Sequence, residues 1–188
     1  EDGVPLFLVT GGCGFIGSHL ADSLAAYGHG VRILDDLSTG RRENAPEAAE
    51  IIVGDVADGA TVAAAASGVD GIFHLAAIAS VQRSIEDWAG THRVNLTGAI
   101  NVFDAARTAS GGKPVPVVYV SSAAVYGDNP AVPLSEDAET LPLTAYGADK
   151  LGCELHARVA HQVHQVPDAG FRFFNIYGPR QDPASPYS

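Results

Sequence analysis

The stretch Thr10-Gly11-Gly12-Cys13-Gly14-Phe15-Ile16-Gly17 decides the fold. Its glycines at 11, 14 and 17 stand between a short apolar run that ends at Thr10 and a helical pattern that starts at Phe15. Glycines allow a tight turn and a close backbone approach to a diphosphate, and the next helix offers N–H donors and a positive dipole at its N-terminus. The stretch therefore predicts a dinucleotide-binding loop, with a purely structural glycine turn as the alternative.

Outward from this loop, apolar runs of strand length alternate with helical patterns. The runs are nearly continuous in apolar residues and are bounded by turn residues, which is typical of strands covered on both faces of a parallel sheet. Their alternation predicts an α/β fold of the Rossmann type, a doubly wound parallel sheet with helices on both faces. The predicted strands are 6–9, 31–34, 51–53, 71–75, 115–120 and 170–174, and the predicted helices are 15–27, 58–67, 92–109 and 144–166.

Composition limits the classes of partner. The 188 residues are 46% hydrophobic, which is ample for a core, and the formal net charge is −11. Scattered Arg and Lys residues offer no basic patch, which argues against nucleic acid and anionic membranes as partners. No apolar run approaches the roughly 18 residues of a membrane helix, and the acidic start differs from a signal peptide. With Cys13 and Cys153 interpreted as reduced and no metal-ligand spacing, we expect a cytoplasmic protein without a metal.

An acidic residue at the end of the second predicted strand indicates which dinucleotide is bound. Asp35 lies near the spacing of about 20 residues at which a carboxylate accepts the ribose hydroxyls. This carboxylate, with Asp36 beside it, would repel a 2′-phosphate, so NAD is favoured over NADP. Arg41 and Arg42 are the counter-argument, because a nearby Arg can hold that phosphate. Asp55, after the third strand, is a contact for the adenine or a solvated loop aspartate.

A second group of residues suggests acid–base chemistry. Tyr146 and Lys150 share one face of a predicted helix, and Ser122 ends the fifth predicted strand. Ligands of parallel sheets sit at the carboxyl ends of strands, so these residues share an edge with the glycine loop. Tyrosine ionises near pH 10, and a nearby cation lowers such a pKa by about 1–3 units. Lys150 and the positive nicotinamide ring would together make Tyr146 a base, unless Tyr146 is a structural helix aromatic.

A set of motifs resembles the extended short-chain dehydrogenases/reductases, the NAD-dependent epimerase/dehydratase family. Within it, the chain is most similar to the 4-epimerases of UDP-glucose and UDP-N-acetylglucosamine. These enzymes oxidise C4 of the sugar with tightly bound NAD and return hydride to the other face. The motifs are Thr10–His19, Asp35–Gly40, His74–Ala77, Val94–Gly98, Ser121–Gly127, Tyr146–Lys150 and Phe173–Arg180.

The resemblance implies three groups of site residues. Ser122, Tyr146 and Lys150 carry over as the catalytic triad. The contacts to the nucleotide sugar would be Ser84, Ser122, Tyr146 and Asn175. The contacts to NAD would be Gly11, Gly14, Phe15, Ile16, Gly17, Asp35, Asp36, Ser38, Thr39, Gly40, Asp55, Val56, Leu75, Ala76, Ala77, Asn95, Ser121, Tyr146, Lys150 and Phe173.

Two departures from the family pattern bear on function. Sugar-nucleotide dehydratases carry an Asp-Glu pair after the catalytic Ser or Thr, whereas this chain has Ala123 and Ala124, which cannot transfer protons. Family members also continue into a C-terminal region that closes over the nucleotide sugar, and this region is largely absent here. We therefore expect an NAD-binding domain over 1–178 and the start of a truncated substrate-binding region over 179–188, which binds NAD but turns over poorly alone.

The resemblance also implies a homodimer, formed through the helices 92–109 and 144–166 as a four-helix bundle. The sequence leaves other activities open: a nucleotide-sugar decarboxylase, reductase or dehydratase on the same three residues, or a catalytically silent NAD-binding module. The intact set of Ser122, Tyr146 and Lys150 argues against a silent module, because a sensor needs no matched acid–base groups.

Overall fold

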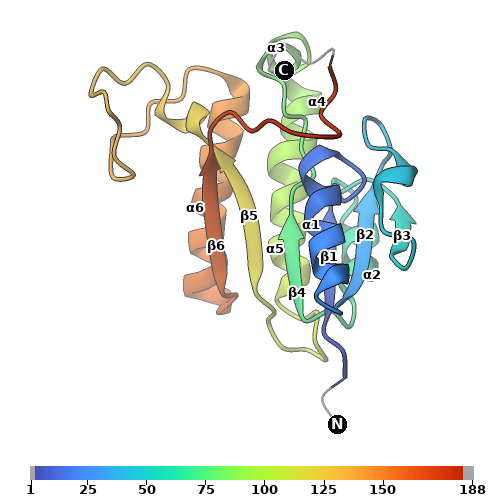
Figure 1. Cartoon of the computed structure of the whole chain (residues 1–188). Helices are drawn as coiled ribbons and strands as arrows, with labels where there is room; N and C mark the ends of the chain where they lie inside the picture. The colour runs from blue at the N-terminus through green and yellow to red at the C-terminus, as the bar shows by residue number, and fades with distance from the viewer. Residues whose placement is uncertain (1–2, 184–188) are drawn as a thin grey trace.

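The computed structural model of the chain describes residues 3–183, and six parallel strands form one sheet at its centre (Figure 1). The strands are β1 (Leu6–Thr10), β2 (Gly30–Asp35), β3 (Glu50–Val53), β4 (Gly71–His74), β5 (Val117–Ser122) and β6 (Asp168–Phe173). Their order is β3-β2-β1-β4-β5-β6, so the chain changes direction across the sheet between β1 and β4. In open parallel sheets ligands bind at such a switch point. The predicted Rossmann-type fold is confirmed.

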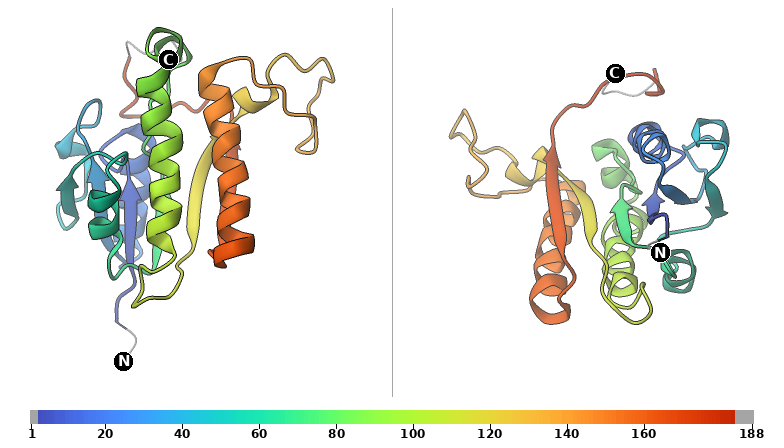
Figure 2. Two further views of the ribbon diagram at one scale, coloured as in Figure 1. Left: turned by 180° about the vertical axis from the view of Figure 1, so that it is seen from behind. Right: turned by 60° about the horizontal axis from the view of Figure 1, so that its bottom comes forward.

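Helices pack on both faces of the sheet. The helix α1 (Phe15–Ala26) covers one face, and α2 (Gly59–Ala66), α5 (Gly98–Ala106) and α6 (Ala145–His164) cover the other (Figures 1 and 2). Successive residues of a strand point to opposite faces. Leu8 therefore packs on the side of α2, α5 and α6, and Val9 packs on the side of α1, and both are fully buried. This two-sided burial explains why the strands are almost continuously apolar in sequence.

The helix predicted over 92–109 has different bounds. It begins as α4 (Trp88–His92), passes through the π-helical segment η2 (Arg93–Thr97) and continues as α5 to Ala106. Asp87 sets the start, because its carboxylate accepts from the Gly90 N–H. The helix ends early because i→i+3 bonds tighten its last turn. A short helix before it, α3 (Val81–Glu86), spans too few residues to show a full apolar period in the sequence.

The other bounds shift by a few residues. Thr144 is the N-cap of α6 and accepts from the Gly147 N–H, and Gln165 ends α6 with a left-handed φ of 57°. The strand predicted over 115–120 runs instead over Val117–Ser122, because Pro116 has no N–H for the ladder. Short 3₁₀ segments cover Arg42–Asn44 (η1) and Ala123–Tyr126 (η3). The predicted boundary at residue 178 stays a prediction, and residues 184–188 lie outside the described residues.

Between residues 3 and 183, no helix combines the length and the apolar character needed to cross a membrane.

A buried hydrogen bond joins β1 and β4 at the switch point. Thr10 pairs with His74 in the register of the two strands, and the Thr10 hydroxyl lies 2.8 Å from the His74 Nδ1. The same hydroxyl oxygen accepts from the N–H groups of Leu75 and Ala76, both at 3.2 Å. Since this uses both lone pairs, the hydroxyl donates its proton to Nδ1, and the imidazole carries its own proton on Nε2. Burial and the Lys150 charge lower the pKa of His74 to about 3.

Replacing His74 should weaken the dependence of stability on pH. Folded His74 stays neutral, whereas an unfolded histidine takes up a proton near pH 6.5, so the free energy of unfolding falls as the pH drops below that value. The wild-type chain should lose about 2 kcal/mol by this route between pH 6.5 and pH 5. In urea titrations at both pH values, the free energy of unfolding of His74→Gln should fall by less than that of the wild-type chain. Above pH 7 the free energies of unfolding of the two proteins should change with pH in the same way. The same pH dependence of both proteins below pH 6.5 would contradict the assignment of a neutral His74.

Candidate functional site

The glycine loop joins β1 to α1 at the switch point. Gly11 has a φ of 70°, which favours glycine, and a Cβ there would lie 2.8 Å from the Ala76 backbone nitrogen. A Cβ on Gly17 would run into the Gly11 carbonyl oxygen. Among the described residues, none caps the N-terminus of α1 with a side chain, and its first turn carries no acidic residue. The positive end of α1 therefore faces an open cradle that fits a diphosphate.

Asp35, at the end of β2, braces the glycine loop. Its carboxylate accepts from the N–H of Cys13 and from the N–H of Leu37, both at 2.9 Å, and the residue is 6% exposed. Each carboxylate oxygen keeps a further lone pair, which is the acceptor that a ribose hydroxyl requires. Burial, with the Asp35 charge beside it, raises the pKa of the Cys13 thiol to about 11. Cys13 is therefore a packing residue and not a nucleophile.

The turn 36–40, which holds the predicted cofactor contacts Asp36, Ser38, Thr39 and Gly40, folds back onto the glycine loop. Asp36 Oδ1 accepts from both the N–H and the hydroxyl of Ser38. The next residue, Arg41, donates its N–H to the Cys13 carbonyl at 2.9 Å. The structure thus brings the turn and the glycine loop together at one end of the edge.

Asp55 and Val56 follow β3. Asp55 forms an ion pair with Arg93 at 2.6 Å, and its other oxygen accepts from the Ala57 N–H. Its carboxylate is therefore held in place, which differs from a freely solvated loop aspartate. Val56 is 4% exposed and packs in the core against Gly98. Contact between Asp55 and an adenine stays a prediction.

Asn95 holds the turn that follows β4. Its side-chain amide pairs with both backbone groups of Ile78, accepting at 2.7 Å and donating at 3.2 Å. The π-helical segment η2 places Asn95 there, and π-bulges often occur at functional sites. Asn95 is 1% exposed, so its visible role is to fix Leu75, Ala76 and Ala77 against the glycine loop. Direct contact of these residues with a cofactor stays a prediction.

The predicted catalytic residues lie on the first turns of α6 and at the end of β5. The Lys150 Nζ donates to the Val120 carbonyl at 2.8 Å and lies 5.9 Å from the centroid of the Tyr146 ring. Ser122 is the last residue of β5, and its Oγ accepts from the Ala124 N–H at 3.1 Å. Lys150 thus bonds to the strand whose end carries Ser122, with Tyr146 one helical turn before it on the same face.

Lys150 lies in a buried environment. It is 5% exposed, and burial lowers the pKa of its ammonium group, while Cys153 and Asp149 oppose the shift. Asp149 is itself buried and forms a 2.7 Å pair with His92. A positive charge screened from water acts on a neighbouring phenol more strongly than an exposed one does.

Ser121, a predicted cofactor contact, faces away from the edge. It is 1% exposed, and its hydroxyl donates to Glu154 on α6. Burial opposes ionisation of Glu154, but hydrogen bonds from Arg172 and Ser121 outweigh it and keep the pKa of Glu154 below its usual value. Arg172 on β6 also donates to the Tyr126 hydroxyl at 2.8 Å. This network fixes β5, β6 and α6 relative to one another and so sets the position of the neighbouring Ser122.

The predicted substrate contacts do not all face the open edge. Ser84 in α3 is 1% exposed and donates to the Val81 carbonyl at 2.7 Å, so little of it is available to a ligand. Asn175 is exposed just beyond β6. Phe173 pairs with Ser122 in the sheet register and lies at the same edge. The geometry brings Ser122, Tyr146, Phe173 and Asn175 to one end of the edge.

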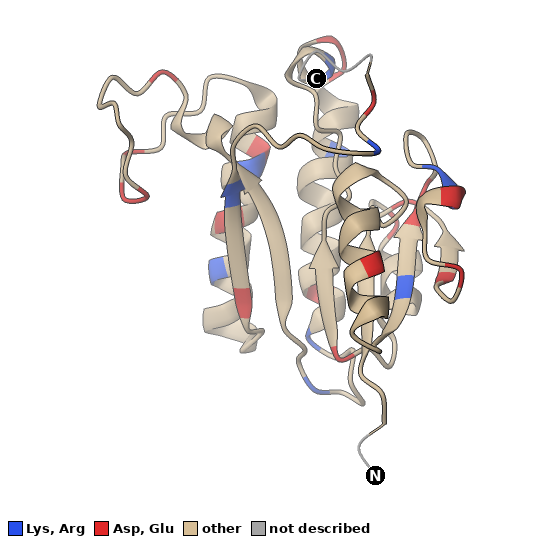
Figure 3. Ribbon diagram, viewed as in Figure 1, with Lys and Arg blue, Asp and Glu red and all other residues tan. Residues whose placement is uncertain are grey.

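Basic and acidic residues are interspersed along the ribbon in the view of Figure 3. Within residues 3–183, no group of three or more His, Cys, Asp or Glu side chains is arranged to hold a metal ion.

Sequence reasoning assigned no role to Thr10, His74, Glu154 or Arg172. The contact between Thr10 and His74 could have been predicted. Each residue ends a strand beside the switch point, and neighbouring parallel strands place such residues opposite each other. The Glu154–Arg172 pair joins residues of a helix and a later strand, and no spacing rule predicts it.

Solved structures resemble the chain across the whole described fold. A UDP-N-acetylglucosamine 4-epimerase from Methanobrevibacter ruminantium, solved with UDP-N-acetylmuramic acid, is 38% identical with a TM-score of 0.91, over 98% of this chain and 59% of its own. A UDP-glucose 4-epimerase from Thermus thermophilus, solved with NAD, is 36% identical with a TM-score of 0.88, over 97% of this chain and 59% of its own.

Sequence comparison agrees. A UDP-glucose 4-epimerase from Mycolicibacterium smegmatis is 42% identical over 183 residues, which are 94% of this chain and 58% of the relative. The chain therefore spans somewhat more than half the length of the curated relatives it matches. The family model that matches, over residues 7–187, describes the NAD dependent epimerase/dehydratase family. With the glycine cradle, the sheet order and these matches together, the chain belongs to the NAD-dependent epimerase/dehydratase family.

Proposed function

We propose that this chain is the NAD-binding part of a nucleotide-sugar 4-epimerase, which acts at C4 of UDP-glucose and UDP-galactose or of their N-acetyl analogues. The proposal is supported by the contact of Lys150 with Tyr146 and with β5, whose last residue is Ser122 on the same sheet edge as the glycine loop. The names of the relatives support it. NAD, when bound, supplies a two-electron acceptor that later returns the electrons to the sugar.

The residues of the chain then handle the proton and the orientation of the sugar. Tyr146 takes the proton from the C4 hydroxyl and later gives it back. The positive charge of Lys150, fixed by its bond to Val120, stabilises the phenolate of Tyr146. The Ser122 hydroxyl, at the rim of β5, hydrogen-bonds the sugar oxygen that reacts.

The residues after Ser122 favour epimerisation over dehydration. Eliminating water needs an acid and a base beside the sugar, and the first turn after β5 carries Ala123 and Ala124 in η3. Their methyl groups exchange no protons. A decarboxylase or reductase could use the same three residues, and a silent NAD-binding module would need none of them.

Turnover with UDP-galactose tests the proposal directly. The NAD-loaded full-length enzyme that contains this chain should form UDP-glucose without net accumulation of reduced nicotinamide. Because general acid–base groups contribute about 10²- to 10⁴-fold, Tyr146→Phe should lower the rate by that order while the chain still binds NAD. The control Tyr27→Phe, at the 83% exposed C-cap residue of α1, should change neither the rate of turnover nor the binding of NAD.

Three results would redirect the assignment. Full activity of Tyr146→Phe would remove Tyr146 from the mechanism. Net accumulation of reduced nicotinamide would indicate a dehydrogenase, and release of CO₂ from UDP-glucuronate would indicate a decarboxylase.

The chain should also prefer NAD to NADP. The Asp35 carboxylate, held in place by Cys13 and Leu37, would repel the 2′-phosphate of NADP. We expect an affinity for NAD at least about tenfold higher, equivalent to about 1.4 kcal/mol, in equilibrium titrations followed by fluorescence. Equal or tighter NADP binding that is lost in Arg42→Gln would show that the arginines after β2 outweigh Asp35.

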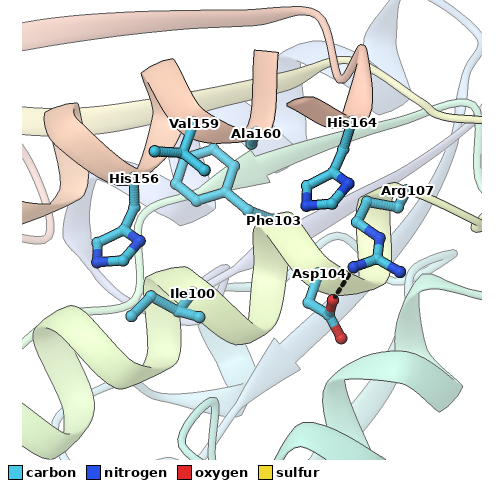
Figure 4. A pocket seen from close by; sticks show the side chains of 8 residues that line it. All are labelled: Ile100, Phe103, Asp104, Arg107, His156, Val159, Ala160 and His164. Carbon is cyan, nitrogen blue, oxygen red and sulfur yellow. Dashed lines mark ion pairs between the residues drawn. The ribbon is translucent and has the colours of Figure 1, made fainter. Parts of the chain in front are cut away.

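We further propose a homodimer through α5 and α6. A shallow pocket lies between these helices on their outer face and is lined by Ile100, Phe103, Asp104, Arg107, His156, Val159, Ala160 and His164 (Figure 4). Val159 and Val163, one turn apart on α6, are 48% and 65% exposed, and neighbouring exposed apolar side chains of this kind mark interaction sites. Sedimentation should therefore show a dimer that Val163→Glu dissociates. Tyr27→Glu, on α1 across the sheet, should leave it intact.

A further inference from the structure

A segment after β6 crosses the carboxyl edge of the sheet and ends against α1. We call residues 174–182 the strap (Figures 1 and 2). Its far end is tied to α1 by three polar contacts. Arg180 Nη1 donates to Asp22 Oδ2 at 2.7 Å and to the Ser18 hydroxyl at 3.1 Å. The His19 Nε2–H donates to the Pro179 carbonyl at 2.9 Å.

The strap spans the same interval that the proposed cofactor must span. It starts after Phe173, which pairs with Ser122 at the catalytic end of the edge. It ends on α1, whose N-terminus carries the glycine cradle. Near that end, the Cα of Gly178 faces the ring of Phe15, to which an added Cβ would come within 3.6 Å. The strap therefore crosses the carboxyl edge of the sheet from the end of β5 and β6 to α1.

Two aromatic residues in the strap are exposed among the described residues. Phe174 and Tyr177 are 65% and 88% exposed. The end of the strap is held in a specific conformation, because Arg180 has a left-handed φ of 68°, which is unfavourable for a residue with a Cβ. Contacts that fix such a conformation mark switch and clamp regions. Segments with few buried contacts are also the ones that open locally.

We propose that Arg180, with Asp22 and Ser18, forms a latch that holds the strap across the carboxyl edge of the sheet, over the proposed NAD site, and thereby sets the rates at which NAD enters and leaves. The inference rests on the proposed binding of NAD. Arg180 acts as a positioning residue through the strap, and it does not touch the reacting groups. The latch contacts join the strap to Ser18, His19 and Asp22 of α1 and use no residue of the glycine loop, so we expect their contribution to be similar with and without NAD.

Because the latch contributes similarly with and without NAD, its effect should be seen in the rates of binding and release. Opening the latch should raise the association and dissociation rates together and leave the equilibrium constant nearly unchanged. If Arg180 instead attracted the diphosphate directly, its loss would weaken binding and change mainly the dissociation rate.

The experiment uses the chain loaded with NADH and chased with excess NAD, with release followed by nicotinamide fluorescence, and a matching stopped-flow measurement of binding. A partly exposed ion pair with its hydrogen bonds is worth about 1 kcal/mol, so Arg180→Gln and Asp22→Asn should each raise both rates by roughly three- to tenfold. The double variant should bind and release NADH at rates close to those of either single variant, because both substitutions remove the same ion pair. Glu50→Gln, which removes the Arg32–Glu50 pair at the far edge of the sheet, is the matched control and should change neither rate.

Added salt provides a second readout. Screening weakens the ion pair, so the wild-type release rate should rise with salt more steeply than that of Arg180→Gln. Unchanged rates in both latch variants, or a weakened equilibrium affinity with an unchanged association rate, would overturn the latch and leave the proposed function standing. Failure of the wild-type chain to bind NADH at all would overturn both.

Discussion

The close approach of β1 and β4 at the switch point is the constraint on which the rest of the structure depends. Gly11 lies so near the Ala76 backbone that a side chain there has no room, and the Thr10 hydroxyl closes the gap by bonding His74, Leu75 and Ala76. A neutral imidazole suits this place, because a charge would have to be buried beside Lys150. The buried contact between Thr10 and His74 thus holds in place the glycine loop that would bind a diphosphate.

At the other end of the edge, buried polar contacts take the same role for the acid–base residues. Lys150 is bonded to Val120, and Glu154 on the same helix pairs with Arg172 across β5 and β6. Both contacts are formed by α6, so they set the depth and rotation of the helix that carries Tyr146. Pairs of this kind specify an arrangement more than they stabilise it, since desolvation offsets much of their attraction.

The strap links these two ends. It leaves β6 beside Ser122 and is tied to α1, whose N-terminus follows the glycine loop. The proposed latch lies where the segment has few buried contacts, and a few polar bonds can therefore decide whether it stays closed.

Much of this protein could be predicted from local sequence. The glycine spacing, the apolar runs and the one-turn spacing of Tyr146 and Lys150 reflect short-range geometry, namely tight turns, two-sided burial and helical periodicity. Those rules predicted the fold class, the edge that carries the candidate site and the acid–base group. Helix bounds were less certain, because a cap at Asp87 and a π-helical segment moved the helix that the apolar pattern placed at 92–109.

Only the tertiary structure decided where buried side chains point. Ser121 and Ser122 are neighbours in sequence, yet strand alternation turns Ser121 toward Glu154 and leaves Ser122 at the open rim. The resemblance implies Asn95 and Ser84 as site residues, yet their polar groups bond backbone atoms beneath the surface. The Arg180–Asp22 pair joins residues from opposite ends of the chain. Periodicity and spacing describe neighbours along the chain, whereas these contacts depend on how distant elements pack, and that information exists only in three dimensions.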